Sequence, residues 1–497
     1  MVTFTLFIFL FIGASFAQQQ SICDSECQKS CDTECQKVIE STYQAESRLW
    51  VSDIVSDDFY STPANISTAK PGDILRWENV PYRQLTQNWT IPAGLSFYRI
   101  MYATEDINNK TIPATGWVLL PYHHTLPTPN EPGKLRTVVW THGTAGRSRL
   151  CSTTNNKGLY YDWKAPFILA ESGYAVIAPD YAGQGSDTPQ GFMYESGFLH
   201  VADVAYAVIA SRKVLGALLS NKWAVFGHSE GGMTAWRTVE RLSLPGQERL
   251  LKAGQFVGGV AAAPALRPQR LIPTSWEQTK TGGGPFSVYF LQSLAGLFPE
   301  QIELSDYLTN TALQRLSVLD NSCFQTGIAA VGSLSPDEIF TNKSWLTHPV
   351  TNEWAVRFNG QGPHPLSTPL LVVQGVTDTI TPASLTMEDF NLTCSTYPKS
   401  PASAKLYPNM GHGQVLEAGR ADIEAWLDAR FHGEPVKKEC KIELVQPLTT
   451  QYAQGEMFWE ANLVQSEYPV LDTFSQYLLY QSSRWSQVTY DLDQGYS

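Results

Sequence analysis

The stretch from Trp223 to Gly232 constrains the fold of this chain more than any other. It reads WAVFGHSEGG, a short apolar run followed by a tight turn. The turn has the G-x-S-x-G spacing of a nucleophile elbow, in which a serine occupies a sharp strand-to-helix turn. Glycines two residues to either side of Ser229 leave room for that turn. The stretch therefore predicts a strand, a raised Ser229 and a following helix, although an ordinary strand-to-helix turn can carry the same pattern.

Two further residues complete a predicted catalytic triad. A serine hydroxyl is a weak nucleophile until a histidine takes its proton and a carboxylate stabilises the imidazolium. In chains with this elbow the order is serine, acid, histidine. Asp378 lies in QGVTDTITP, directly after an apolar run, and His412 lies in the glycine-flanked MGHG. We predict the triad Ser229, Asp378 and His412, with Glu388 and Asp389 as alternative acids in a helical stretch.

The loop after another apolar run, 136–140, is predicted to supply part of an oxyanion hole. Such a hole needs two N–H donors aimed at the developing negative charge. The backbone amide of Glu230 is one candidate, and the loop WTHGTAG offers the amide of Thr144 as the other. His142 in this loop is expected to orient the backbone, and His228 in the elbow is expected to be structural.

The rest of the chain favours an α/β fold. Apolar runs alternate with helical stretches, which predicts a mostly parallel sheet with helices on both faces. The first two strands are a candidate antiparallel entry to that sheet. The expected strands are 98–103, 115–120, 136–140, 174–178, 222–226, 256–262 and 368–373, and the expected helices are 165–172, 201–219, 233–242 and 421–431.

The alternation breaks between the sixth and seventh strands, where an inserted helical cap is predicted. Its expected helices are 287–298, 304–319 and one opened by the capping box Ser335-Pro-Asp-Glu338. The chain is therefore expected to divide as follows: signal peptide 1–17, Cys-rich extension 18–45, core 46–265, cap 266–365, core 366–432 and aromatic-rich extension 433–497.

Several features predict a secreted glycoprotein. Residues 1–17 form an apolar run that ends in the small residues Ser15 and Ala17, as in a cleaved signal peptide; a membrane anchor is the alternative. The even count of eight cysteines fits an oxidising compartment. Five glycosylation sequons begin at Asn65, Asn88, Asn109, Asn342 and Asn391.

The cysteines fall into two groups. Cys23, Cys27, Cys31 and Cys35 recur every four residues, which would place them along one face of a helix. They could pair with each other, with a second helix or with a second chain, or bind zinc. The remaining four, Cys151, Cys323, Cys394 and Cys440, allow three pairings. For the aromatic tail, a packed appendage, an oligomer contact and a carbohydrate-binding surface all remain open.

Charge and motifs exclude other classes of function. The net charge of −12 argues against nucleic acid or an anionic membrane surface as a partner. We recognise no metal cluster, phosphate loop or dinucleotide fingerprint, so no cofactor is expected.

The motifs WTHGTAG, APDYAGQGS, FGHSEGG, QGVTDTITP and MGHG together resemble the secretory lipase family and related bacterial acyl-ester hydrolases, over roughly residues 95–430. The resemblance implies an α/β-hydrolase fold with a helical cap and hydrolysis of carboxylic esters, including lipids. It also implies catalytic roles for Ser229, Asp378 and His412 and an oxyanion role for Thr144. Several such sequences carry glutamine after the serine, where this chain has Glu230.

The leading hypothesis is a secreted serine hydrolase that cleaves carboxylic esters through an acyl-enzyme. Its substrate would be a small-molecule or lipid ester, with transient contact between the cap and a lipid interface. An exopeptidase of the same fold is the alternative, and it would need a polar anchor such as Asp337 or Glu338 in the cap. A non-enzymatic binding protein on the same scaffold is a third hypothesis. The sequence predicts no oligomeric state.

Overall fold

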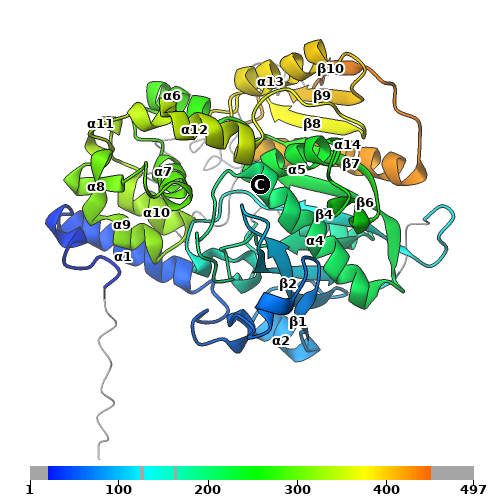
Figure 1. Ribbon diagram of the computed structural model, residues 1–497, viewed down its shortest axis with the longest axis horizontal. Coiled ribbons are helices and arrows are strands. Elements are labelled where there is room, and N and C mark those ends of the chain that lie inside the picture. The colour runs from blue at the N-terminus through cyan, green and yellow to red at the C-terminus, as the bar shows by residue number, and fades with distance from the viewer. Residues whose placement is uncertain (1–20, 124–127, 162–164, 449–497) are drawn as a thin grey trace, which may run out of the picture.

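The computed structural model describes residues 21–123, 128–161 and 165–448. An α/β body and a separate layer of helices lie side by side (Figure 1). The predicted signal peptide and the aromatic tail from residue 449 lie outside the described residues. Within them, no helix has both the length and the apolar character needed to cross a bilayer.

A single ten-stranded sheet forms the body, in the order β1-β2-β3-β5-β4-β6-β7-β8-β9-β10. From β5 to β10 all neighbours pair in parallel, whereas β1, β2, β3 and β5 pair antiparallel. The mostly parallel sheet and its antiparallel entry are thus confirmed. The strands are β1 (Ile74–Asn79), β2 (Ser96–Glu105), β3 (Thr111–Leu120), β4 (Leu135–Thr141), β5 (Ala175–Pro179), β6 (Leu219–His228), β7 (Gln255–Ala262), β8 (Leu370–Gly375), β9 (Ala402–Tyr407) and β10 (Cys440–Leu444).

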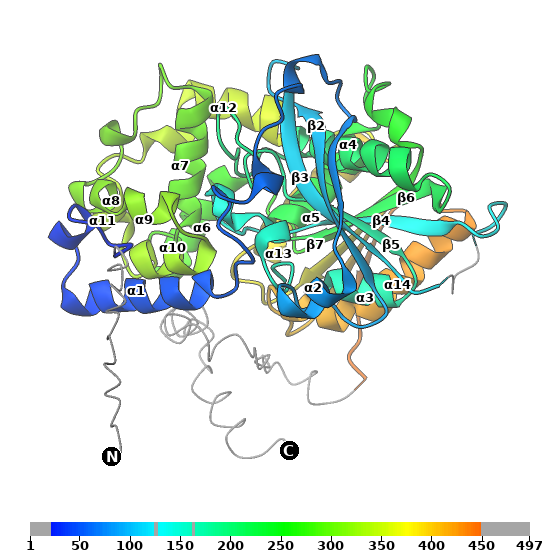
Figure 2. The ribbon, with the colours of Figure 1, turned by 90° about the horizontal axis from the view of Figure 1, so that it is seen from below.

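Helices cover both faces of the sheet (Figure 2). Alternate residues of a strand point to opposite faces, so Val225 of β6 joins one hydrophobic core while Ala224 and Phe226 join the other. The first core also contains side chains of α4 (Gly197–Leu215), α5 (Glu230–Arg241) and α13 (Ala383–Thr396). The second contains side chains of α3 (Ala165–Glu171) and α14 (Gln414–His432). Burial on both faces explains the continuous apolar runs of the central strands.

The cap is a layer of short helices between β7 and β8, with its own hydrophobic core around Phe290, Trp345 and Trp354. The capping box at Ser335 and Glu338 is present as predicted. The helices are α6 (Pro268–Thr279), α7 (Phe286–Leu297), α8 (Asn310–Gln314), α9 (Leu316–Asp320), α10 (Phe324–Val331), α11 (Pro336–Ile339) and α12 (Pro349–Trp354).

The predicted single helix 304–319 is wrong. A 3₁₀ turn, Leu304–Asp306, is followed by α8 and α9 as separate helices. Leu308 forms an isolated β-bridge with Phe340, which requires extended backbone at that position. Thr309 then caps α8, because its hydroxyl oxygen accepts from the N–H of Ala312 at 3.2 Å. The apolar spacing of this stretch fits a helix, but the tertiary contact of Leu308 with Phe340 interrupts it.

The N-terminal cysteines do not share one helix face, so that expectation is also wrong. Cys27 lies in a 3₁₀ turn, and only Cys35 lies within α1 (Thr33–Ser47). The side chain of Asp32 accepts from the N–H of Cys35 at 2.9 Å and starts α1 there. The four disulfides are Cys23–Cys27, Cys31–Cys35, Cys151–Cys323 and Cys394–Cys440. All eight sulfurs are therefore in disulfides, which leaves no thiolate for zinc.

Candidate active site

Ser229 lies at the carboxyl end of β6, in the turn that opens α5. Its backbone has φ 60° and ψ −124°, a strained conformation for a residue with a Cβ atom. A Cβ atom at Gly231 would collide with the carbonyl oxygen of Thr141, and one at Gly227 with the hydroxyl of Thr141. The two glycines of the elbow are therefore required because β4 ends against the turn.

Asp378 and His412 meet at the same edge of the sheet. Asp378 lies in the turn after β8, and His412 lies in the loop between β9 and α14. His412 Nδ1 is 2.9 Å from Asp378 Oδ2. Both His412 and Ser229 line one cavity, so the structure brings the three predicted triad residues together.

The Asp378 carboxylate is held by several donors. Oδ1 accepts from the N–H groups of Ile380 and Thr381 at 2.9 and 2.8 Å, and Oδ2 accepts from the Thr381 hydroxyl at 2.7 Å. Burial by itself raises the pKa of Asp378, but His412 and the Thr381 donors outweigh burial and lower the pKa below its ordinary value. The carboxylate is thus ionised and fixed in orientation.

The alternative acids are engaged elsewhere. Glu388 and Asp389 lie on α13 and form ion pairs with Arg267 at 3.0 and 2.9 Å. Neither is among the residues that line the cavity around Ser229. Asp378 is therefore the carboxylate that the structure brings to His412.

The two other histidines near the site bind backbone or tyrosine groups. His142 is buried, and its Nδ1 lies 2.7 Å from the carbonyl oxygen of Gly143. The Nε2 atom of His228 lies 2.8 Å from the carbonyl oxygen of His412, and its Nδ1 contacts the Tyr161 hydroxyl. Burial lowers the pKa of His228 to about 3, so its ring is neutral. His228 thus contacts the loop that carries His412.

The predicted oxyanion loop lies directly beside Ser229. Gly143 and Thr144 line the cavity, and two tyrosines fix Thr144. The Tyr160 hydroxyl donates to the carbonyl oxygen of Thr144, and the Tyr194 hydroxyl lies 2.9 Å from the Thr144 side-chain oxygen. Sequence reasoning did not identify these tyrosines, since nothing in their local sequence marks a contact with a loop residue.

A buried pair of carboxyl groups lies behind the elbow. Glu230 Oε1 accepts from the backbone N–H of Glu195 at 3.2 Å, and Oε2 of each residue has no hydrogen-bond partner among the described residues. Burial raises the pKa of Glu230 to about 8, and burial together with the charge of Glu230 raises that of Glu195 well above its ordinary range. Near neutral pH the pair is therefore largely protonated, since two charges there would lack solvation.

Replacing Glu230 by glutamine is expected to flatten the pH dependence of stability between about pH 5 and pH 8. An unfolded glutamate titrates near pKa ~4.3, so over this range the folded wild type holds a proton that the unfolded chain has lost. The free energy of unfolding of the wild type therefore falls as pH rises towards 8. When the pH is raised from 5 to 8, the Tm of the wild type should fall by about 3 °C more than the Tm of Glu230→Gln, as measured by thermal unfolding scans.

Glu388→Gln is the matched control for this experiment. Hydrogen bonding to Arg267 lowers the pKa of Glu388, so its titration is complete below this range and the variant should follow the wild type. Parallel Tm curves for the wild type and Glu230→Gln would show instead that Glu230 is ionised in the folded protein.

Two adjacent spaces lie beside Ser229. The larger cavity, about 330 Å³, is lined by His412 and the Thr144 loop. The smaller cavity, about 50 Å³, extends under α6 of the cap. Ser229, Phe286 and Ile380 line both spaces. A substrate bound at Ser229 would therefore have room on two sides, and the cap supplies part of both walls.

A strained serine at the carboxyl end of a parallel strand, covered by inserted helices, is the arrangement of enzymes that use a serine nucleophile on an α/β sheet. The chain belongs to the alpha/beta hydrolase family, whose model matches residues 138–417.

Comparisons with individual proteins agree with this assignment. The chain is 24% identical to Lipase 1 of Candida albicans, over 80% of this chain and 84% of that protein. It is 22% identical to the secreted triacylglycerol lipase LIP3 of Malassezia globosa, over 82% and 88%. Among solved structures, Candida antarctica lipase A in its closed state aligns with a TM-score of 0.63 at 16% identity, over 86% of this chain and 95% of that one. The rice cell wall degrading esterase LipA of Xanthomonas oryzae aligns with a TM-score of 0.53 at 17% identity, over 82% and 98%.

Proposed function

We propose that this protein is a secreted carboxylic-ester hydrolase of the lipase or esterase type, with Ser229 as nucleophile, His412 as general base and Asp378 as the acid that orients His412. The observation that carries the proposal is the 2.9 Å contact between His412 and Asp378, with His412 lining the same cavity as Ser229. The lipases and the esterase among the similar proteins support ester bonds as the target.

The proposed reaction proceeds through an acyl-enzyme. Ser229 Oγ attacks the ester carbonyl carbon while His412 takes the hydroxyl proton, and the backbone N–H groups of Thr144 and Glu230 stabilise the oxyanion. His412 then donates that proton to the leaving alcohol oxygen. Water repeats the sequence on the acyl-enzyme and releases the acid, so the serine returns unchanged. Asp378 remains ionised and keeps the Nδ1–H of His412 directed at itself.

Secretion rests on separate support. One of the relatives is named a secreted lipase. All eight cysteines form disulfides, which persist in oxidising compartments. The five sequon asparagines are exposed, as glycan acceptors must be, and their glycosylation stays a prediction.

Transient contact between the cap and a lipid interface is also part of the proposal.

The exopeptidase alternative has little support. The residues that would have anchored a peptide terminus lie away from the cavity: Asp337 forms an exposed ion pair with Lys343, and Glu338 completes a capping box. Neither lines the space around Ser229. The similar proteins reported above are lipases and an esterase.

The test is hydrolysis of p-nitrophenyl esters with acyl groups from acetyl to palmitoyl, combined with labelling by a serine-directed phosphonate. We expect ester turnover with a defined chain-length optimum, and a phosphonate adduct on the peptide that contains Ser229. Aminoacyl-naphthylamides should remain uncleaved. A folded protein that cleaves none of the esters, or a label at another serine, would overturn the proposal.

A further inference from the structure

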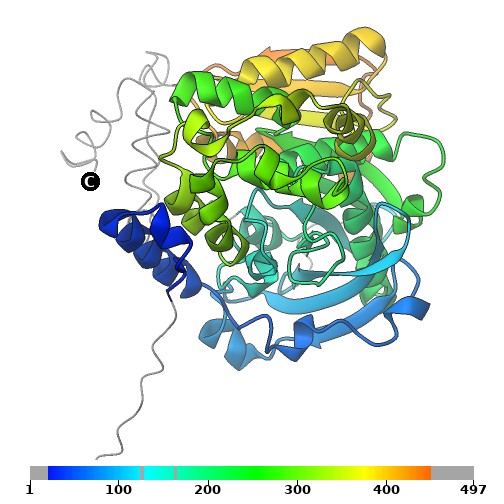
Figure 3. The same cartoon turned by 60° about the vertical axis from the view of Figure 1, so that its left-hand side comes forward.

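The N-terminal segment, residues 21–50, has no part in the catalytic mechanism proposed above. Figure 3 shows α1 lying along the cap helices rather than apart from the molecule. Val38, Ala45 and Leu49 of the segment pack against Ile328 of α10, in a cluster that also contains Phe324. The segment is thus an integral part of the cap layer, and its contacts indicate what it does there.

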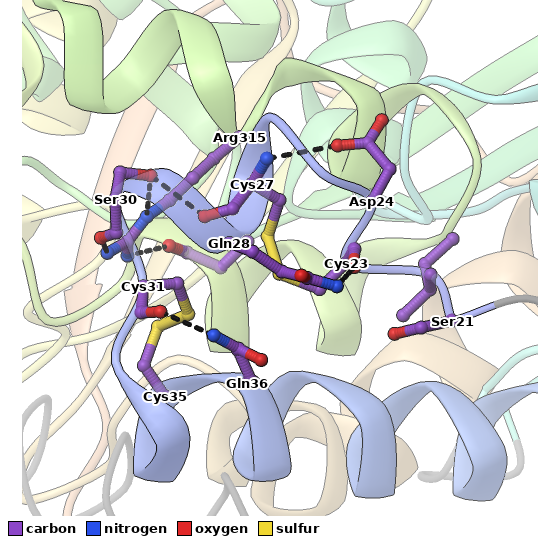
Figure 4. The surroundings of a disulfide bond; sticks show 12 residues. Ser21, Cys23, Asp24, Cys27, Gln28, Ser30, Cys31, Cys35, Gln36 and Arg315 are labelled. Atoms are coloured by element: carbon purple, nitrogen blue, oxygen red, sulfur yellow. Dashed lines mark hydrogen bonds between the residues drawn. A yellow bond between two sulfur atoms is a disulfide. The ribbon is translucent and has the colours of Figure 1, made fainter.

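The first half of the segment is fastened to the cap by Arg315 (Figure 4). The Arg315 guanidinium donates to the carbonyl oxygen of Ser30 and, at 2.6 Å, to that of Ala330 in α10. The disulfides Cys23–Cys27 and Cys31–Cys35 close short loops on either side of Ser30. The chain reversal before α1 is therefore held in one conformation against the cap.

The second half is fastened by Glu46, whose buried carboxylate meets the first turn of α10. It accepts from the N–H groups of Cys323 and Gln325 at 2.9 and 3.0 Å and from the Thr326 hydroxyl at 2.7 Å. Acceptors at a helix N-terminus satisfy N–H groups that have no partner within the helix. The end of α1 and the start of α10 thus form one structural unit.

Beyond α1 the segment turns towards the catalytic centre. The backbone at its end pairs with the loop before Tyr160: the N–H of Lys157 donates to the carbonyl oxygen of Leu49 at 2.8 Å, and the N–H of Val51, the next residue after the segment, donates to the carbonyl oxygen of Asn155 at 2.7 Å. The Trp50 side chain packs in a cluster with the Cys151–Cys323 disulfide and Tyr160. Ala145 of the candidate oxyanion loop belongs to the same cluster, and the Tyr160 hydroxyl binds Thr144. Trp50 therefore packs in the cluster that supports this loop.

Leu49 and Trp50 line the same cavity as Ser229 and His412, together with Phe286 of the cap. We propose that the N-terminal segment forms one wall of the substrate cavity, and that Leu49 and Trp50 limit the size of the apolar group that an ester can present to Ser229. This inference rests on the proposed ester-hydrolase function and adds a specificity determinant to it. The segment is fastened at Ser30, Glu46 and Leu49, so the wall is a fixed part of the cavity.

The test compares kcat/KM for p-nitrophenyl butanoate and p-nitrophenyl palmitate in the wild type and in Trp50→Ala, Trp50→Leu and Leu49→Ala. Removing the indole ring opens space along the cavity wall, so the palmitate-to-butanoate ratio should rise about tenfold in Trp50→Ala. Trp50→Leu should show a smaller rise in the same direction. A general loss of activity lowers kcat/KM for both esters and leaves the palmitate-to-butanoate ratio unchanged, so it would not imitate this result.

Val38→Ala is the matched control, because Val38 lies on α1 and packs against Ile328 without lining the cavity. It should lower Tm and leave the ratio unchanged. If Trp50→Ala does not fold, Trp50→Leu and Leu49→Ala decide the question. An unchanged or lower ratio in the folded variants of an active protein overturns the inference alone, whereas a wild type that hydrolyses no ester removes the proposed function and the inference with it.

Discussion

Replacing Ser229 by alanine is expected to lower kcat for ester hydrolysis by about 10⁶-fold, the loss found when a serine nucleophile of this kind is removed. Ser229 is the hydroxyl at the strained elbow, and His412 and Thr144 line the cavity beside it. Without its oxygen no acyl-enzyme can form, and only water attack assisted by the oxyanion donors remains. KM should change little, since the cavity walls are untouched. Steady-state kinetics on the preferred p-nitrophenyl ester measures both parameters.

The fold should survive this substitution, because alanine keeps the Cβ atom and removes one atom at the cavity surface. Circular dichroism and Tm of the variant should match the wild type. Ser275→Ala is a suitable control, since Ser275 lines the smaller space beside Ser229 without belonging to the triad. It should retain wild-type kcat within about threefold. A Ser229→Ala protein with more than one hundredth of wild-type activity would show that another group is the nucleophile.

The elbow and the triad candidates were accessible from the sequence because each depends on local constraints. Two glycines flank Ser229 because the end of β4 leaves no room for side chains there. Asp378 directly follows a strand whose apolar run is readable, and His412 lies between glycines ahead of a helix. In a parallel sheet the carboxyl ends of strands share an edge, so such residues converge without any knowledge of distant contacts.

The supports of the site were not accessible in this way. Thr144 is held by Tyr160 and Tyr194, and the latter lies in a loop with no local motif. Glu46 lies in the last turn of α1, and its carboxylate binds Thr326 of the cap, 280 residues later in the sequence. Such contacts depend on how distant segments pack, and one sequence without relatives contains no period or spacing that records them.

The cysteine repeat shows the same limit. Its period of four residues fits a helix, but the disulfides and the cap at Asp32 place the helix start within the repeat. The pairing partners of Cys151 and Cys394 also followed only from the fold. The even count of cysteines thus favoured disulfides, but the local spacing did not show how the chain bends between them.

Replacing Asp378 by asparagine is expected to reverse the proton arrangement on His412. Oδ1 of Asp378 accepts from two backbone N–H groups, so the asparagine carbonyl oxygen must occupy that position. Its NH₂ group then takes the place of Oδ2, which lies 2.9 Å from His412 Nδ1. Because an amide N–H there requires an acceptor, Nδ1 must lose its proton and Nε2 must carry it. A His412 protonated at Nε2 cannot take the proton of Ser229.

The expected result is a fall in kcat of about 10⁴-fold with little change in KM, as for the equivalent exchange in other triads. Asp389→Asn is the matched control. Asp389 is a partly buried aspartate on α13 that pairs with Arg267, so its loss should reduce Tm but change kcat less than about threefold. The same ester assay and a Tm measurement on both variants separate the two effects. Equal losses of kcat in the two variants would mean that Asp378 contributes only to folding. We expect the loss to be confined to Asp378→Asn, because the two backbone donors to Asp378 fix the orientation of the asparagine amide, and that orientation sets the tautomer of His412.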